Sequence, residues 1–289
     1  MKTALVLAVL WGLALWTASV RAAEEEPKGA AVSEAALAGR TDIVWFEDFE
    51  SPDWREHWTD VSEGAKTVGE APFLFRGERA FAVRSTRGEH GSMGGSVFFP
   101  QGFDKLYVRY YVYFPTDFTW GQGRYAHLKL FGLEGLRTGQ RWKPTPAGTK
   151  PTGTDKFSSR ICARPKTGAL HFYVYHPDQR GGYGDNRECQ GTLQPGRWHS
   201  LETMLKVNVP GQKDGEVACW LDGQLIGEAK GLRFRDVEDL RIRKVRFDNY
   251  WGGAGDENTA PVEQAHYMDN IVVATDYIGP AQTAESGGK

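Results

Sequence analysis

The sequence has little cysteine and no excess of charge of one sign. Only three of its 289 residues are cysteine, which is too few for the disulfide-dense scaffold of a small secreted domain. Its 35 lysines and arginines nearly balance 37 aspartates and glutamates. This balance argues against nucleic acid or a membrane surface as a partner held by overall charge. Any anionic partner must therefore be bound by a local group of basic residues.

Sequence signatures of several common active sites are also missing. The chain has no Gly-x-Ser-x-Gly nucleophile elbow and no glycine-rich phosphate-binding loop. Its cysteines, Cys162, Cys189 and Cys219, do not have the spacing of metal ligands. One pair could form a disulfide, and buried free thiols fit the sequence at least as well. The sequence does not choose among the three pairings.

The acidic run Glu47-Asp48-Phe49-Glu50 does not have the pattern of a hydrolase site. A glycoside hydrolase needs two carboxylates placed across the scissile bond, and the run lacks the Glu-x-Asp-x-x-Glu spacing of the sandwich hydrolases. We interpret it as an edge or surface feature. We predict no catalytic metal and no required cofactor. Four residues near the C-terminus could help bind a structural Ca²⁺, although turn chemistry explains them equally well: Asp248, Asn249, Asp269 and Asn270.

The one long hydrophobic run of the chain lies at its N-terminus. A basic start is followed by an apolar run over residues 4–16 and by Val20-Arg21-Ala22, an order typical of a secretory signal peptide. We expect a signal peptide over residues 1–22, cleaved after Ala22. A membrane anchor is the alternative, but the run is short for a membrane span. The sequence thus predicts a secreted or periplasmic protein with no membrane partner after cleavage.

The remainder of the chain is predicted to form one domain. Residues 23–40 are polar and alanine-rich, which favours a flexible leader. Residues 41–280 are expected to form the folded domain, and residues 281–289 a disordered tail. No internal repeat is present, and we expect a monomer.

The abundance of glycine and aromatic residues indicates strands joined by tight turns. The chain has 35 glycines, 10 tryptophans, 11 tyrosines and 15 phenylalanines, and Asp222-Gly223 is a strong hairpin signal. We predict an all-β fold, a jelly-roll or concanavalin-like sandwich of two antiparallel sheets. A long insertion is expected over residues 132–155. Strands are predicted at residues 106–114, 126–131, 157–163, 170–175, 198–207, 216–221, 242–250 and 267–274.

Several predicted strands carry aromatic and basic residues on the face turned away from the core. In the strand over residues 106–114, this face holds Tyr107, Arg109, Tyr111 and Tyr113. Aromatic rings stack on sugar rings and forked donors bind carboxylates, so such a face suits a carbohydrate. The alternative is an ordinary solvated sheet face. We predict substrate-binding roles for Arg109, Tyr111, Tyr113, His127 and His171.

The segments over residues 157–163 and 170–175 are predicted to form a hairpin. Their apolar residues share one face, and burying both sets together fixes the register. Arg160 then lies across from Tyr173, and Ser158 across from Tyr175, on the opposite face. His171 lies on that face too.

These residue types suit proton abstraction from a uronic acid. A nearby cation favours the phenolate form of tyrosine and lowers its pKa, which makes tyrosine a usable acid or base. The C5 proton of a uronate is acidified once its carboxylate is neutralised by arginine or lysine. Removing this proton and expelling the C4 oxygen is a β-elimination.

The run Phe157-Ser158-Ser159-Arg160, followed by Tyr173-Val174-Tyr175, resembles polysaccharide lyase family 14, the alginate lyase-like lyases. Segments 126–130, 247–253 and 267–273 are similar to that family as well, and the resemblance covers roughly residues 43–280. It implies a jelly roll whose concave sheet binds an acidic polysaccharide. It also implies an active site made of Lys129, Ser158, Arg160, Tyr173 and Tyr175.

The function predicted from the sequence is that of a polysaccharide lyase acting on an acidic polymer by β-elimination. Tyr175 or Tyr173 would act as base and acid, while Arg160 and Lys129 neutralise the carboxylate. A non-catalytic carbohydrate-binding module would show the same aromatic face and is the main alternative. A sandwich glycoside hydrolase is a weaker alternative because the carboxylate motif is missing.

Overall fold

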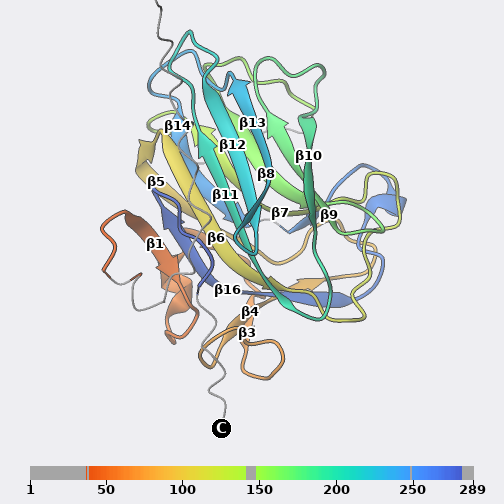
Figure 1. Cartoon of the computed structure of the whole chain (residues 1–289). Helices are drawn as coiled ribbons and strands as arrows, with labels where there is room; N and C mark the ends of the chain where they lie inside the picture. The colour runs from red at the N-terminus through yellow and green to blue at the C-terminus, as the bar shows by residue number, and fades with distance from the viewer. Residues whose placement is uncertain (1–36, 38, 141–147, 248, 282–289) are drawn as a thin grey trace, which may run out of the picture.

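The computed structural model describes residues 37, 39–140, 148–247 and 249–281 (Figure 1). The expected signal peptide and most of the expected tail lie outside these residues. Leu37, near the end of the expected leader, is buried against Val272 and Ile278. Ala281 donates its backbone N–H to the Tyr111 hydroxyl. No helix within the described residues is long and apolar enough to cross a membrane.

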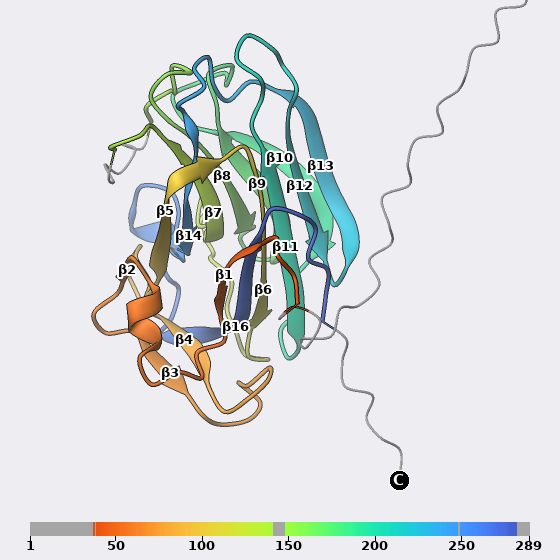
Figure 2. The same cartoon turned by 90° about the vertical axis from the view of Figure 1, so that its left-hand side faces the viewer.

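Two sheets of antiparallel strands form the protein, and Figure 2 shows them as two facing layers. The first sheet has the order β13-β12-β11-β6-β16-β4-β3, with β1 paired to β16. Its strands are β1 (Ile43–Glu47), β3 (Lys66–Val68), β4 (Ala80–Ser85), β6 (Lys105–Tyr113), β11 (Trp198–Lys206), β12 (Gly215–Leu221), β13 (Gln224–Leu232) and β16 (Gln264–Ala274).

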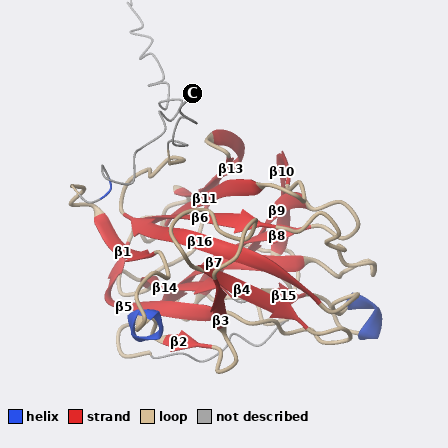
Figure 3. Cartoon of the chain, turned by 90° about the horizontal axis from the view of Figure 1, so that it is seen from below, coloured by secondary structure: helices blue, strands red, loops and turns tan. Residues whose placement is uncertain are grey.

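The second sheet has the order β10-β9-β8-β7-β14-β5-β2, with β15 paired to β7. Its strands are β2 (Asp60–Val61), β5 (Gly95–Phe103), β7 (Leu128–Leu136), β8 (Phe157–Ala163), β9 (Ala169–Tyr175), β10 (Asp185–Thr192), β14 (Arg241–Phe247) and β15 (Tyr250–Trp251). Two short 3-10 helices, η1 (Trp54–His57) and η2 (Asp256–Asn258), complete the regular structure seen in Figure 3. The predicted antiparallel sandwich is confirmed.

Alternation of apolar residues builds the core between the two sheets. On β6 the inward side chains are fully buried, and Tyr110 packs edge-on against Phe131 of β7 and Phe247 of β14. On β8 and β9, Ile161 and Phe172 face each other across the hairpin and are also buried. Burial of these large side chains from both layers supplies the main stabilising free energy of the fold. The predicted Asp222-Gly223 turn joins β12 to β13, and both residues have positive φ.

Some predicted strand boundaries are wrong. The strand expected at residues 126–131 is β7, which runs on to Leu136, so the first residues of the expected insertion belong to the sheet. Gly135 is needed there because a Cβ at that position would lie 2.1 Å from the Phe157 ring. The strand expected at residues 242–250 is divided into β14 and β15 by Asn249, which has φ 39°. Strands β2, β3, β4, β5 and β10 had no predicted counterpart.

The structure separates the three cysteines by face. Cys162 lies opposite His171 on the side of the second sheet that faces away from the core. Cys189 and Cys219 both pack into the core, and burial together with the neighbouring Cys189 thiol raises the pKa of Cys219. All three are free thiols. Since the sheet lies between Cys162 and the other two, only Cys189 and Cys219 are placed to pair.

The Tyr110 hydroxyl predicts an unusual response to mutation. It is fully buried, and it has no hydrogen-bond partner among the described residues. A buried unsatisfied hydroxyl is unfavourable, so Tyr110→Phe should raise the free energy of unfolding by about 1 kcal/mol in urea titration. Tyr111→Phe is the matched control, because it removes a hydrogen bond from Ala281 and should lower that free energy by about 1 kcal/mol. A loss of stability in Tyr110→Phe as large as that in Tyr111→Phe would show that the Tyr110 hydroxyl stabilises the fold.

Candidate active site

The β8–β9 hairpin has the register predicted from the sequence. Arg160 pairs with Tyr173 and Ser158 with Tyr175. These four side chains lie on the face of the second sheet that points away from the core, which we call the outer face. The hydroxyls of Tyr173 and Tyr175 are 3.1 Å apart and hydrogen-bonded. Burial of the apolar residues on the inner side therefore gathers two phenols, a hydroxyl and a guanidinium on one surface.

Lys129 joins this group from β7. It pairs with Cys162 of β8 and with Tyr250 of β15. Its Nζ lies 4.4 Å from the centre of the Tyr250 ring and 5.7 Å from that of Tyr173, so the two rings hold the ammonium group by cation–π contact. The structure thus brings together all five residues of the predicted catalytic set.

Tyr250 was not predicted to belong to the site. Two signals were available in the sequence: its aromatic ring near the end of the strand expected at residues 242–250, and the resemblance of segment 247–253 to the lyase family. The turn at Asn249 starts the separate strand β15, which places Tyr250 beside Lys129.

Glu134 of β7 was also missed, because it falls in the expected insertion. Its carboxylate lies 3.2 Å from Arg160, 3.3 Å from Arg246 and 4.0 Å from Lys244. Burial alone would raise the pKa of Glu134, but these three cations outweigh it and hold the pKa below its usual value. Glu134 is therefore an anion that fixes the position of Arg160 on the outer face.

Gly132 of β7 pairs with Arg160 of β8 on one side and with Arg246 of β14 on the other. A Cβ at Gly132 would be 2.6 Å from Cγ of Arg160 and 2.9 Å from the backbone oxygen of Ser159. Because Gly132 has no side chain, the Arg160 side chain can lie over β7 and reach Glu134. A glycine inside a strand often marks such a close approach.

His127 and His171 form a pair next to Lys129. Their ring centres are 4.8 Å apart at an interplanar angle of 64°. Burial, together with Arg164 and Lys129, lowers the pKa of His127 to about 4. Burial, together with His127 and Arg164, lowers the pKa of His171 to about 3. Both rings are therefore neutral near pH 7, and they can serve as hydrogen-bonding groups rather than as cations.

The expectation that a nearby cation lowers the pKa of the site tyrosines is wrong for Tyr173. Burial and the hydrogen bond to Tyr175 raise the pKa of Tyr173 above its usual value. Because the side chain is withdrawn from water, its phenolate form is poorly solvated and therefore disfavoured. Tyr173 therefore holds its proton at neutral pH.

Arg109, Tyr111 and Tyr113, which were predicted to bind substrate, do not lie on the outer face with the hairpin residues. All three are on β6, in the first sheet. Arg109 is fully buried and donates to the backbone oxygens of Gly279 and Asn270. The ring of Tyr111 stacks on Phe75 at 3.5 Å, and the Tyr113 ring packs against Trp198. Alternation shows that a strand has two faces, but it does not show to which sheet the strand belongs.

The acidic and amide residues considered in the sequence have structural contacts. The acidic run lies on and just after β1, which pairs with β16 alone among the described strands, so its interpretation as an edge feature holds. Glu47 itself is not a surface residue, because it is buried and accepts hydrogen bonds from the Phe49 backbone and the Trp58 indole. Asn249 binds His266. Asp269 accepts backbone N–H groups. Asp248 lies outside the described residues, among which no group of three or more His, Cys, Asp or Glu could hold a metal.

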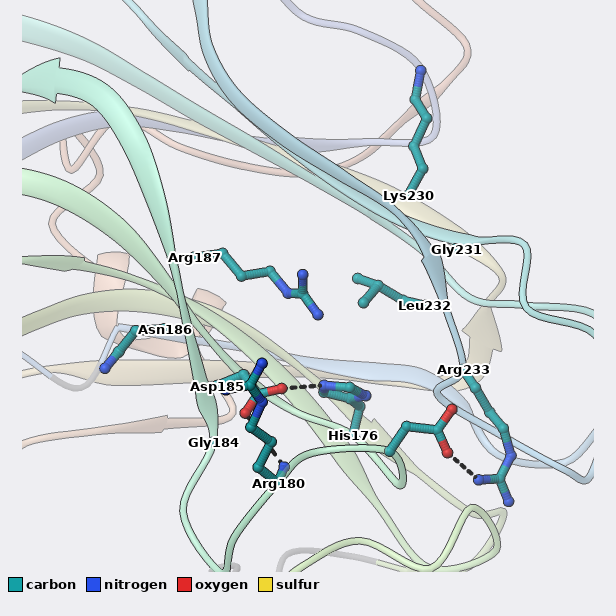
Figure 4. A pocket seen from close by; sticks show the side chains of 11 residues that line it. His176, Arg180, Gly184, Asp185, Asn186, Arg187, Lys230, Gly231, Leu232 and Arg233 are labelled. Carbon is teal, nitrogen blue, oxygen red and sulfur yellow. Dashed lines mark hydrogen bonds and ion pairs between the residues drawn. The ribbon is translucent and has the colours of Figure 1, made fainter.

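A separate cavity of about 660 Å³ lies at one edge of the sandwich, between β10 and β13 (Figure 4). His176 lines it and binds Asp185 at 3.0 Å. Arg187 and Arg233 line it as well. Asn186, which also lines this cavity, pairs with Tyr173 of β9.

The close contact at Gly132 predicts a loss of stability on a small substitution. In Gly132→Ala the new methyl group would collide with Arg160 and with the backbone of β8, which should lower the free energy of unfolding by about 2 kcal/mol in urea titration. Gly91→Ala is a matched control, because nothing lies within 4 Å of a Cβ there. Equal stability of the two variants would contradict the proposed contact.

The neutral state of His171 predicts a dependence of stability on pH. Its pKa of about 3 in the folded chain lies below the ordinary value of 6.5, so its stabilising contribution is complete above pH 6.5 and is lost as the pH falls toward 3. His171→Asn cannot take up this proton. Between about pH 7 and about pH 4.5 the variant should lose about 2 kcal/mol less unfolding free energy than the parent protein. Parallel pH profiles of the two proteins would argue against a buried neutral ring.

Comparison with known proteins supports the resemblance found in the sequence. The family model described as polysaccharide lyase 14 matches residues 82–271, while no curated protein matches the sequence. The structure is similar to that of the marine PL-14 alginate lyase from Aplysia kurodai, with a TM-score of 0.66 and 21% identity over 81% of this chain and 99% of that one.

Two further solved structures have the same fold. An alginate lyase from a Chlorella virus has a TM-score of 0.63 and 18% identity, covering 81% of this chain and 100% of that one. An endo-β-1,4-glucuronan lyase from the fungus Trichoderma reesei has a TM-score of 0.54 and 16% identity, covering 81% and 96%. The match to the family model spans more than half of the sequence. The chain therefore belongs to polysaccharide lyase family 14 and is a polysaccharide lyase.

Proposed function

We propose that the protein cleaves a uronate-containing polysaccharide by β-elimination on the outer face of the second sheet. The observation that carries this proposal is the register of the β8–β9 hairpin, which sets Arg160 beside Tyr173 and Ser158 beside Tyr175. Lys129 adds a second cation within reach of the Tyr173 ring. Carboxylate-binding groups and proton-transfer groups thus converge on one surface.

The structural neighbours support the choice of polymer. They include lyases named for alginate and for glucuronan, and both polymers carry carboxylates on their sugar rings. A polymer of this kind also suits the cations Lys129 and Arg160 on the outer face, in a protein whose formal net charge is only -2.

In the proposed reaction, Arg160 and Lys129 neutralise the carboxylate of the sugar that is to be cleaved, and Ser158 donates a hydrogen bond to it. This stabilises the negative charge that develops when the C5 proton leaves. Tyr175, acting as a phenolate that accepts a hydrogen bond from Tyr173, takes that proton, the electron pair forms the C4–C5 double bond, and the bond from C4 to the glycosidic oxygen breaks. Tyr173 keeps its proton because its pKa is raised, and it gives this proton to the departing oxygen.

The proposed site of action is outside the cytoplasm. A signal peptide over residues 1–22 would export the protein to a secreted or periplasmic location, where polysaccharide is accessible. His127 and His171, neutral beside Lys129, are proposed to hydrogen-bond sugar hydroxyls. A monomer suffices, because all five proposed catalytic residues come from one chain.

The proposal predicts a specific loss of activity in Tyr175→Phe. Turnover of polymannuronate, polyguluronate and glucuronan is followed by the ultraviolet absorbance of the new C4–C5 double bond. Removing a positioned acid or base costs about 10²–10⁴ in rate, so Tyr175→Phe and Tyr173→Phe should each lose at least a hundredfold. Tyr183→Phe is a matched control, because Tyr183 is 65% exposed, and it should retain full activity.

Two outcomes would overturn parts of this proposal. Absence of the absorbance on every uronate polymer, with binding retained, would show a protein that binds carbohydrate without cleaving it. Full activity in Tyr175→Phe would instead move the base to another residue. Binding of polymer by Tyr175→Phe, measured by calorimetry, separates loss of chemistry from loss of affinity.

A further inference from the structure

The cavity between β10 and β13 is lined by charged side chains from both layers of the sandwich. It has a volume of about 660 Å³ and lies beside the edge strands of the two sheets (Figure 4). One wall comes from β10, another from the end of β13 and the residue after it, and the loop between β9 and β10 completes the lining. The lining includes His176, Asp178, Arg180, Asp185, Arg187, Leu232 and Arg233.

Arg187 lies on the inner side of β10. Its partner in the register is the buried Phe172, whereas the preceding Asn186 pairs with Tyr173. Because successive residues of a strand point to opposite sides of the sheet, Arg187 faces the other layer of the sandwich. Figure 4 shows its side chain extending from β10 into the cavity, toward Leu232. A guanidinium therefore occupies the side of the sheet that Phe172 uses for the core.

The Arg187 side chain has no hydrogen-bond or ion-pair partner among the residues that the structure describes. Its Nε atom is buried. Nδ1 of His176, a side chain that is only 4% exposed, also lacks a partner within the described ranges. Burial and the charge of Arg187 lower the pKa of His176, against the opposing effect of Asp185, so the ring is neutral near pH 7. Half-buried charge without a partner is unfavourable, and a bound ligand is one explanation for such a group.

The two carboxylates that line the cavity are bound to other groups. Asp178 lies 2.8 Å from Arg233 and 2.9 Å from Lys213. Asp185 lies 3.0 Å from Nε2 of His176. It is close to Arg187 in the strand, but no ion pair joins the two side chains in the described part of the chain. The guanidinium of Arg187 is therefore the group that an anion entering the cavity would meet.

We propose that this cavity binds a small oxyanion through the guanidinium of Arg187. A guanidinium presents parallel N–H donors in one plane, which match two oxygens of a phosphate, a sulfate or a carboxylate. Arg180, an exposed residue of the lining, adds a second positive charge. The bound anion gives Arg187 a partner and steadies β10, an edge strand that pairs with β9 beside Tyr173. Binding at this site does not depend on the lyase reaction.

Calorimetric titration tests the site directly. The protein is titrated at pH 7 with sodium phosphate, sodium sulfate and sodium acetate, with sodium chloride keeping the ionic strength constant. Loss of charge-assisted hydrogen bonds in Arg187→Gln should weaken binding about tenfold or more, and Arg187→Lys should recover part of the affinity. Arg87→Gln is the matched control, because Arg87 is exposed and does not line the cavity. Binding of phosphate and sulfate alone would assign a tetrahedral oxyanion, and binding of acetate alone a carboxylate.

Thermal unfolding provides a second measurement. In a buffer without these oxyanions, Arg187→Met should be at least as stable as the parent protein, because it removes a half-buried charge that has no partner in the described structure. With phosphate, sulfate or acetate at a hundred times its Kd, the melting temperature of the parent protein should rise by about 5 °C or more. The same addition should leave the melting temperature of Arg187→Met unchanged.

Several results would overturn the oxyanion site. One is a parent protein that binds none of the three anions, and another is equal affinity in the parent protein and Arg187→Gln. An equal loss of affinity in Arg87→Gln would also overturn it, because the effect would then be one of overall charge. Lower stability of Arg187→Met without oxyanion would show instead that the guanidinium is satisfied within the fold. Each of these results leaves the proposed lyase reaction intact, since ultraviolet absorbance measures that reaction separately.

Discussion

The site depends on the burial of alternate residues along β8 and β9. Phe157, Ile161 and Phe172 can all be withdrawn from water only if the two strands pair in one register. The same register leaves Arg160 beside Tyr173 on the outer face. The positions of the polar groups are thus determined by the apolar ones on the other side of the sheet. This arrangement places chemistry on rigid strands rather than on loops, which limits how far the groups can drift apart.

Ion pairs with Glu134 fix the positions of charged side chains on the outer face that packing alone would leave free to move. Glu134 is withdrawn from water, and a buried carboxylate without partners would be highly unfavourable. Its contacts with Arg160, Arg246 and Lys244 remove this penalty. In return, three long flexible side chains are held toward one point before any substrate arrives. Such preorganisation means that little reorganisation is needed when negative charge develops in a reaction.

The sequence allowed prediction of the antiparallel sandwich, of the hairpin register and of five residues that the structure brings together. These predictions succeeded because short-range alternation and turn chemistry determine them. Sequence alone could not show that Arg109 belongs to the other sheet, since strand order depends on contacts between distant segments. Glu134 was missed because its strand contains Gly132 and Gly135, residues typical of loops. The structure shows that both glycines make room for side chains of β8.

An irregularity in β7 keeps Lys129 and Glu134 on the same side of the second sheet. Lys129 and Glu134 lie an odd number of positions apart, so a regular strand would place them on opposite sides of the sheet. The irregularity between Lys129 and Phe131 adds one residue relative to β8, and Lys129 pairs with Cys162 while Glu134 pairs with Ser158. Regular pairing of β7 with all its residues kept would turn the ammonium group inward, whereas deleting the extra residue would restore an even spacing that leaves both groups on the outer face. The bulge is therefore part of the chemistry of this site, alongside the identity of its side chains.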